Sequence, residues 1–145
     1  MKKLLVLVLM AISFTAAAKS TPEIDLQKKW GMVIQAIAMV ESECQPNRVP
    51  RNGLYVGYLQ ISEILVRECN RIVGYEKYTY ADRYDKQKSI DMFIDFQERY
   101  NPEGNLEKAI RLWNSGDLKC MTRKARTEGY YQRVMKRYTS IATLR

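Results

Sequence analysis

The sequence predicts a mainly α-helical protein that folds as a single compact domain. Apolar residues recur at the three- and four-residue spacing of amphipathic helices along most of the chain. The breaks between these segments are short and rich in proline, glycine or asparagine. The 145 residues hold no internal repeat, low-complexity stretch or linker, and without an N-terminal leader they suit one domain better than two.

The N-terminal segment has the pattern of a secretory signal peptide. Lys2 and Lys3 are followed by an apolar run over residues 4–14 and by three alanines that end at Ala18. The apolar run is shorter than the roughly 20 residues that span a bilayer. No cysteine lies near Ala18, so a lipid anchor is not expected. We therefore expect residues 1–18 to be removed and the mature domain, 19–145, to be exported to the periplasm or cell envelope. An uncleaved membrane anchor is the alternative.

Charge and composition limit the partners that the protein could bind and the side chains that could carry catalysis. The net charge of +8 suits a polyanionic partner such as a cell-wall polymer, and it is the one feature in favour of a nucleic-acid binder. The chain has no histidine, which excludes Ser-His and Cys-His nucleophile pairs and the usual zinc ligand sets. We expect no metal or cofactor, so that carboxylates, tyrosines or a thiol must carry any proton chemistry. Cys44, Cys69 and Cys120 permit one disulfide, whose pairing stays open.

The first predicted helix begins near Thr21-Pro22-Glu23, where a capping residue precedes a proline at the first helical position. Gln45-Pro46-Asn47 ends the helical pattern. Five residues of this segment recur at helical spacing and share one face: Trp30, Ile34, Ile37, Ala38 and Glu41.

A loop with short extended or hairpin pieces is predicted next, near residues 52–61, because Asn52-Gly53 and Gly57 interrupt its apolar residues. Ser62 can cap a second helix that runs to Val73 and stops at Gly74.

Three further helices complete the expected fold. Residues 75–84 form a tyrosine-rich loop with one helical turn, and a third helix covers residues 85–100 before Asn101-Pro102. A short fourth helix covers residues 106–113 and stops at the following Asn-Ser-Gly. The last helix includes residues 130–138, with Val134, Met135 and Tyr138 facing inward.

Glu41 is the candidate catalytic acid. It follows Ile37 by four residues and Ile34 by seven, so it projects from the apolar face, whereas Glu43 lies roughly 200° further round and points away. A carboxyl group entering a partly dry cleft loses hydration, which raises its pKa. A carboxylic acid that stays protonated near neutral pH can protonate a glycosidic oxygen. The residues alone leave open that Glu41 only caps or solvates the helix end.

Two downstream motifs carry groups that could bind a sugar. In GYLQI, residues 57–61, Gln60 can both donate and accept hydrogen bonds, although an ordinary short strand with a polar outward residue explains the motif better when it is taken alone. In WNSG, residues 113–116, Trp113 offers a ring for a sugar and Asn114 an amide, although helix-stop chemistry also explains Asn114 and Gly116.

The order of these motifs resembles that of the soluble, lysozyme-like lytic transglycosylases (glycoside hydrolase family 23, SLT domain). The family pattern runs ES, G-L-M-Q, A-Y-N-A-G and then a tyrosine followed by a K-V pair. Here ES is followed by GYLQI, WNSG and GYYQRV, and the resemblance spans residues 30–138. It implies a lysozyme-like helical fold, with Glu41 as the catalytic acid. It also implies six substrate-binding residues: Ser42, Gly57, Gln60, Trp113, Asn114 and Tyr130.

Several positions match or depart from the family pattern in detail. Leu59 takes the methionine position of the second motif, and Gly116 matches the glycine of the third. Arg133 and Val134 take the positions of the K-V pair. Four departures concern the shape of the sugar-binding subsites: Tyr58 for leucine, Trp113 for tyrosine, Ser115 for alanine, and Asp117-Leu118 for Gly-Pro.

The resemblance implies cleavage of the β-1,4 bond between N-acetylmuramic acid and N-acetylglucosamine in peptidoglycan, with a 1,6-anhydro product. The expected partner is the glycan strand, not nucleic acid, and a secretion or conjugation apparatus is a further partner to consider. We expect the protein to be a monomer that is not stably inserted in a membrane. One alternative is a hydrolytic lysozyme with Glu43 or Glu63 as its second carboxylate. Others are a non-catalytic glycan-binding protein of an envelope-spanning apparatus and an exported nucleic-acid binder.

Overall fold

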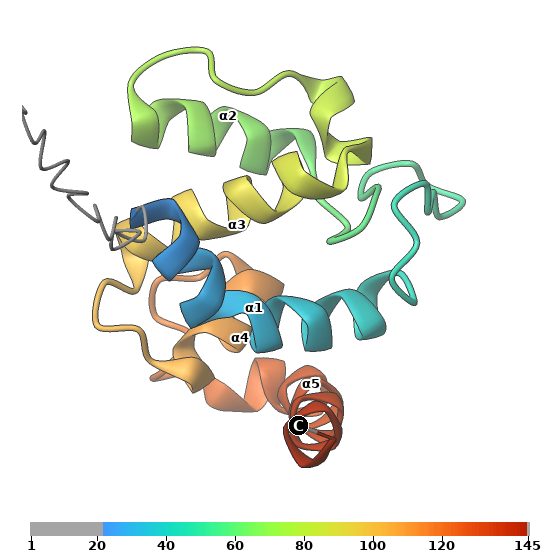
Figure 1. Ribbon diagram of the computed structural model, residues 1–145, viewed down its shortest axis with the longest axis vertical. Coiled ribbons are helices and arrows are strands. Elements are labelled where there is room, and N and C mark those ends of the chain that lie inside the picture. The colour runs from blue at the N-terminus through green and yellow to red at the C-terminus, as the bar shows by residue number, and fades with distance from the viewer. Residues whose placement is uncertain (1–21, 145) are drawn as a thin grey trace, which may run out of the picture.

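The computed structural model describes residues 22–144, and within this range the chain forms five α-helices and two 3₁₀ helices (Figure 1). The α-helices are α1 (Pro22–Glu41), α2 (Glu63–Val73), α3 (Lys86–Tyr100), α4 (Leu106–Ser115) and α5 (Glu128–Thr143), and the 3₁₀ helices are η1 (Tyr80–Tyr84) and η2 (Lys124–Thr127). This confirms the predicted mainly helical, single-domain fold. The predicted signal peptide and Thr21 lie outside the described residues.

The helices group into two parts around a shared core. In Figure 1, α2 and α3 lie side by side above α1, α4 passes behind α1, and α5 lies below, seen nearly along its axis. Helix α1 packs against α5 and also contacts α3 and α4. Among the described helices, none combines the length and apolar character needed to cross a membrane.

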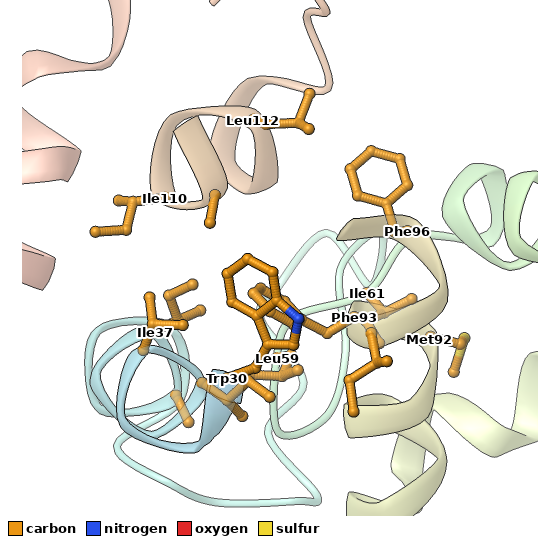
Figure 2. Packing of buried hydrophobic residues seen from close by; sticks show 14 of the residues in the cluster. Trp30, Ile37, Leu59, Ile61, Met92, Phe93, Phe96, Ile110 and Leu112 are labelled. Atoms are coloured by element: carbon orange, nitrogen blue, oxygen red, sulfur yellow. The ribbon is translucent and has the colours of Figure 1, made fainter. Parts of the chain in front are cut away.

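Trp30 of α1 lies at the centre of this core. Its side chain is 2% exposed, its ring meets Phe93 of α3 edge-on at a centroid distance of 5.9 Å, and its indole N–H donates to Glu98 Oε1 at 3.1 Å. Figure 2 shows Trp30 among side chains from α1, α3 and α4, together with Leu59 and Ile61 from the loop before α2. The predicted apolar face of α1 is therefore buried against three other segments of the chain.

The segment between α1 and α2 contains less extended structure than predicted. Its extended part is one antiparallel bridge, in which Ile61 N–H donates to Val56 O at 2.8 Å and Val56 N–H donates to Ile61 O at 3.2 Å. Leu59 and Ile61 are both buried in the core. The loop is thus anchored by its own apolar residues, which fixes the backbone beside the end of α1.

Local capping signals set several helix boundaries. Ser62 Oγ accepts from Leu65 N–H at 3.2 Å, and Gly74, at φ 85°, closes α2, as predicted. Helix α4 extends through Ser115 rather than ending at Trp113, because the left-handed residue is Gly116, at φ 61°. Helix α5 is longer than residues 130–138 and buries Ile141 in addition to Val134.

Candidate active site

A pocket of ≈ 890 Å³ lies where the end of α1, the loop before α2, α2, α3 and the end of α4 meet. It holds four of the predicted site residues: Glu41, Gln60, Trp113 and Asn114. Its other lining residues are Pro50, Asn52, Tyr55, Ser62, Ile64, Leu65, Arg67, Glu68, Arg71, Phe96, Leu112, Ser115 and Gly116. Ser42, Gly57 and Tyr130 do not line this pocket.

Glu41 is the last residue of α1, and its carboxyl group is partly buried at the pocket. Tyr130 of α5, 89 residues away in the sequence, donates its hydroxyl hydrogen to Glu41 Oε1 at 2.7 Å. Burial raises the pKa of Glu41 above its ordinary value, while the Tyr130 hydrogen bond and the positive charge of Arg133 act in the opposite direction. The net effect is a carboxyl group that holds its proton to higher pH than an exposed glutamate.

Tyr130 is the donor in this pair and stays protonated. Its side chain is 7% exposed, and burial together with the nearby Glu41 charge raises its pKa well above the ordinary tyrosine value. A phenol in this state donates one hydrogen bond to the carboxylate and cannot compete with Glu41 for the role of acid.

The chain turns sharply directly after Glu41. The N–H groups of Ser42 and Cys44 both donate to Ala38 O, at 3.0 and 3.1 Å, and Glu43 adopts a left-handed φ of 55°. Glu43 is exposed and does not line the pocket, which agrees with the predicted separation of the two carboxylates. The cause is this turn, not the helical phase, because α1 ends before Glu43.

Ser42 connects the acid-bearing helix to the GYLQI loop. Its side chain is 1% exposed, and its hydroxyl lies 2.7 Å from Tyr58 O and 3.2 Å from Ala38 O. The hydroxyl is therefore used within the protein, and Ser42 fixes the position of Glu41 without facing the pocket.

Gly57 and Gln60 fix the backbone conformation of the loop before α2. Gly57 has φ 80°, and a Cβ atom there would lie 1.8 Å from Arg83 O, so no larger residue fits. Gln60 also has a left-handed φ, 51°, and its Nε2 donates to Gly57 O at 2.9 Å and to Arg48 O at 3.2 Å. The amide donors of Gln60 hold the loop together, and its Oε1 has no partner within residues 22–144.

Trp113 and Asn114 present different chemistry at the end of α4. The Trp113 ring packs against Phe93 at 4.9 Å and Phe96 at 6.1 Å between centroids, and it lines the pocket. Asn114 is exposed at the same pocket, and its amide makes no hydrogen bond to another described residue. The ring is thus packed on one side, and the amide is available to hydrogen-bond with a ligand in the pocket.

Charged residues of α2 form a wall of the pocket that was not predicted from the sequence. Glu68 accepts from Arg71 Nε at 2.8 Å and from Arg71 Nη2 at 2.6 Å, and it also accepts from the Tyr100 hydroxyl. The Arg71 hydrogen bonds are the main cause that lowers the pKa of Glu68. Arg67, one turn earlier, donates from Nη1 to the Tyr80 hydroxyl at 3.0 Å. These residues belong to the polar face of an amphipathic helix, which in a sequence is indistinguishable from a solvated face.

The remaining candidate groups lie away from the pocket. Glu63, a candidate second carboxylate, is exposed and lies 3.5 Å from Arg83 Nη2. Cys44, Cys69 and Cys120 are free thiols. In the described part of the chain, no group of three or more acidic, cysteine or histidine side chains could hold a metal ion.

No family model, curated protein or solved structure matches this chain. The resemblance in motif order therefore stays a prediction.

Proposed function

We propose that the protein is a peptidoglycan lytic transglycosylase in which Glu41 acts as both general acid and general base. The observation that carries this proposal is the state of Glu41, a partly buried carboxyl group with a raised pKa at a large pocket, held by one hydrogen bond from Tyr130. Residues 19–145 would act after export, as the predicted signal peptide suggests. Assembly with a secretion or conjugation apparatus is compatible with this activity and rests on the sequence alone.

The chemistry proceeds in two steps. Protonated Glu41 donates its proton to the glycosidic oxygen as the bond from that oxygen to C1 of N-acetylmuramic acid breaks, and the acetamido oxygen of the same sugar stabilises the positive charge at C1. The Glu41 carboxylate then removes the proton from the 6-hydroxyl of that sugar as this oxygen bonds to C1. The acid is regenerated, no water is consumed, and the product is a 1,6-anhydro sugar.

The carboxylates of the chain support a mechanism with a single acid. Glu43 and Glu63 do not line the pocket. Glu68 lines it, but both of its oxygens accept hydrogen bonds from Arg71, and Tyr100 adds a third. A carboxylate in this state is a weak nucleophile or base, which leaves Glu41 to serve in both steps.

The other predicted site residues divide into two groups in this proposal. Trp113 packs against the apolar face of a sugar, and Asn114 and the Oε1 of Gln60 hydrogen-bond to its polar groups. Ser42, Gly57 and Tyr130 are positioning residues, because their contacts hold Glu41 and the loop in place.

A hydrolytic lysozyme is the second candidate, and the observation in its favour is that Glu68 shares the pocket with Glu41. A retaining or inverting hydrolase uses two carboxyl groups and adds water at the cleaved bond. The two candidates therefore differ by one water in the mass of every new reducing-end sugar.

The test is digestion of purified peptidoglycan followed by mass spectrometry of the products. We expect 1,6-anhydro ends from the wild type and a rate at least 10²–10⁴-fold lower from Glu41→Gln, because the general acid is lost. Glu43→Gln, two residues away on the exposed turn, is the control and should cleave like the wild type. Hydrated reducing ends would support the lysozyme instead. Glycan binding without cleavage, alike in wild type and Glu41→Gln, would identify a binding protein.

A further inference from the structure

We propose that Arg67 and Arg71 form a carboxylate-binding subsite in the pocket, which recognises a carboxylate carried by the muramic acid of the glycan. The identity of the ligand rests on the proposed function, whereas the subsite itself rests on the geometry of α2. Both arginines line the same pocket as Glu41.

The spacing of the two arginines places them together. They are four residues apart on α2, so they lie one turn apart on the same side of the helix. Glu68 and Tyr100 hold Arg71 through its Nε and Nη2 atoms, and Tyr80 holds Arg67 through Nη1. Each guanidinium group is therefore oriented by neighbours before any ligand arrives, which reduces the entropy cost of binding.

Both guanidinium groups keep free donors. Nη1 of Arg71 and both Nε and Nη2 of Arg67 have no hydrogen-bond partner among residues 22–144. A planar guanidinium with adjacent free N–H groups binds the two oxygens of a carboxylate in a matching fork. The wall can thus accept an anion without breaking the contacts that hold it.

The charge of the pocket favours the same ligand. Its charged lining residues are Glu41, Arg67, Glu68 and Arg71. Glu68 balances one arginine, and Glu41 is neutral in the protonated form that the first step of the proposed mechanism requires. The pocket in its reactive state therefore carries one uncompensated positive charge, which attracts an anionic group and offers nothing to a neutral sugar.

Peptidoglycan offers a carboxylate from two sources. The lactyl group of muramic acid ends in a free carboxylate when its peptide has been removed, and the peptide stem carries carboxylates of its own when it is present. N-acetylglucosamine carries neither. Recognition of the substituent would tell the muramic acid side of the cleaved bond from the other side.

The test measures binding, by calorimetry, to the Glu41→Gln protein, so that no ligand is consumed. The ligands are short glycan strands with peptide stems, the same strands with stem carboxylates converted to amides, strands without peptides, and a neutral N-acetylglucosamine oligomer. We expect the amidated strands to bind about tenfold more weakly than the acidic ones. Comparison of the stem-bearing and peptide-free strands assigns the source of the carboxylate.

Arg67→Gln and Arg71→Gln, added singly, should remove most of the preference for acidic strands. Arg67→Gln is the cleaner change, because the one hydrogen bond of Arg67 to a described residue is with Tyr80, whereas Arg71 hydrogen-bonds to both Glu68 and Tyr100. Arg137→Gln, at an exposed position of α5, removes the same charge away from the pocket and should preserve the preference.

The subsite would be overturned if acidic and amidated strands bound equally and the peptide-free strands bound no more tightly than the neutral N-acetylglucosamine oligomer, even if the wild type cleaves peptidoglycan. The same holds if Arg137→Gln lowers the preference as much as Arg67→Gln does. Conversely, a preference that depends on Arg67, in a protein whose wild type cleaves nothing, would support the subsite and refute the catalytic proposal. These comparisons between ligands need no arginine variant, so they decide the question even if one of the variants fails to fold.

Discussion

At the residue scale, three opposing influences set the proton affinity of Glu41. Burial disfavours its charged form, while the Tyr130 hydroxyl and the charge of Arg133 favour that form. Burial outweighs the other two, so the pKa is raised. A positioned acid of this kind is useful near neutral pH, where an ordinary glutamate would already have lost its proton.

Tyr130→Phe should shift the pH dependence of cleavage upward. The hydroxyl hydrogen bond lowers the pKa of Glu41, so its removal raises that pKa further. The proposed mechanism needs protonated Glu41, so it predicts that kcat/KM falls as pH rises through this pKa and that the alkaline limb of the profile moves to higher pH in the variant. The maximal rate should fall less than the 10²–10⁴-fold expected for Glu41→Gln.

Tyr131→Phe is the matched control for this change. Tyr131 is the neighbouring tyrosine, and its ring lies 4.3 Å from the Arg111 guanidinium rather than at Glu41. We expect its alkaline limb to coincide with that of the wild type. An unmoved limb in Tyr130→Phe would show that the hydrogen bond does not tune the acid.

Glu41→Gln should make the protein more stable at neutral pH, although the proposed function requires that the same change removes activity. The folded-state pKa of Glu41 lies above its unfolded value of about 4.5, so the folded state binds more protons and the wild type loses stability as pH rises through that window. Glutamine avoids this loss and can still accept from Tyr130. The advantage should be present at pH 8 and absent below pH 4.5, as urea unfolding at several pH values can measure.

Glu43→Gln provides the reference for this stability measurement. Its side chain is exposed, and surface substitutions of this kind change stability by less than about 0.5 kcal/mol. If Glu41→Gln gains no stability over the wild type at pH 8, the cost of burying the charged carboxylate has been misjudged.

At the scale of elements, the capped ends of α2 and α4 were predictable and the end of α1 was not. Ser62, Gly74 and the Gly at 116 act through local backbone geometry, which residue type reveals. The end of α1 depends on Ala38 O accepting from two N–H groups in a left-handed turn, and no sequence signal distinguished this from a continuing helix. Helical phase therefore predicted the exposure of Glu43 correctly but for the wrong reason, since the turn after α1 causes it.

Gly57→Ala should destabilise the protein strongly, because two costs combine. The left-handed φ costs a residue with a Cβ roughly 1–2 kcal/mol, and the clash with Arg83 O at 1.8 Å forces an overpacked contact to relax at about 1–3 kcal/mol more. Gly53→Ala separates the two, because Gly53 also has a left-handed φ, 62°, but no atom within 4 Å of a built Cβ.

Urea unfolding of the two variants measures the difference. We expect Gly57→Ala to lose about 2–5 kcal/mol and Gly53→Ala to lose only the strain. If the two variants lose the same amount, the loop accommodates a methyl group and is not held against Arg83 as the structure indicates.

Arg111 of α4 holds the N-terminal end of α5 beside α4. Arg111 is 2% exposed, and its guanidinium donates to Glu107 Oε1 at 2.8 Å, to Lys124 O at 2.9 Å and to Glu128 Oε2 at 2.6 Å. Tyr130 follows Glu128 by two residues on α5. The donor to the candidate acid thus depends on a buried arginine that sequence reasoning did not single out, since a lone arginine in a helix is usually exposed.

At the scale of the whole molecule, the site exists only when the chain is folded. Tyr130 and Glu41 are 89 residues apart, and the other walls of the pocket come from the loop before α2, from α2, from α3 and from α4. The sequence could predict Glu41, Gln60, Trp113 and Asn114 as site residues through the motif order. It could not predict the α2 wall, because amphipathic periodicity shows which residues avoid the core but not whether they face a pocket or open solvent.

The three cysteines differ in exposure, so their reactivity reports whether the whole domain is folded. Cys44 is exposed on the turn after α1, whereas Cys69 and Cys120 are buried. Burial raises the pKa of Cys69 to about 12 and also raises the pKa of Cys120, so both thiols are protonated and shielded from reagents.

A thiol-reactive reagent at neutral pH should therefore modify one cysteine rapidly in the folded protein and all three in denaturant, without prior reduction. Cys44→Ser should abolish the rapid phase, and Cys69 should then react only as fast as the fold opens, because the thiolate forms only in the open state. Cys69→Ser is the reciprocal control and should keep the rapid phase. Fewer than three reactive thiols in denaturant would reveal a disulfide and contradict the arrangement of free thiols seen in the structure.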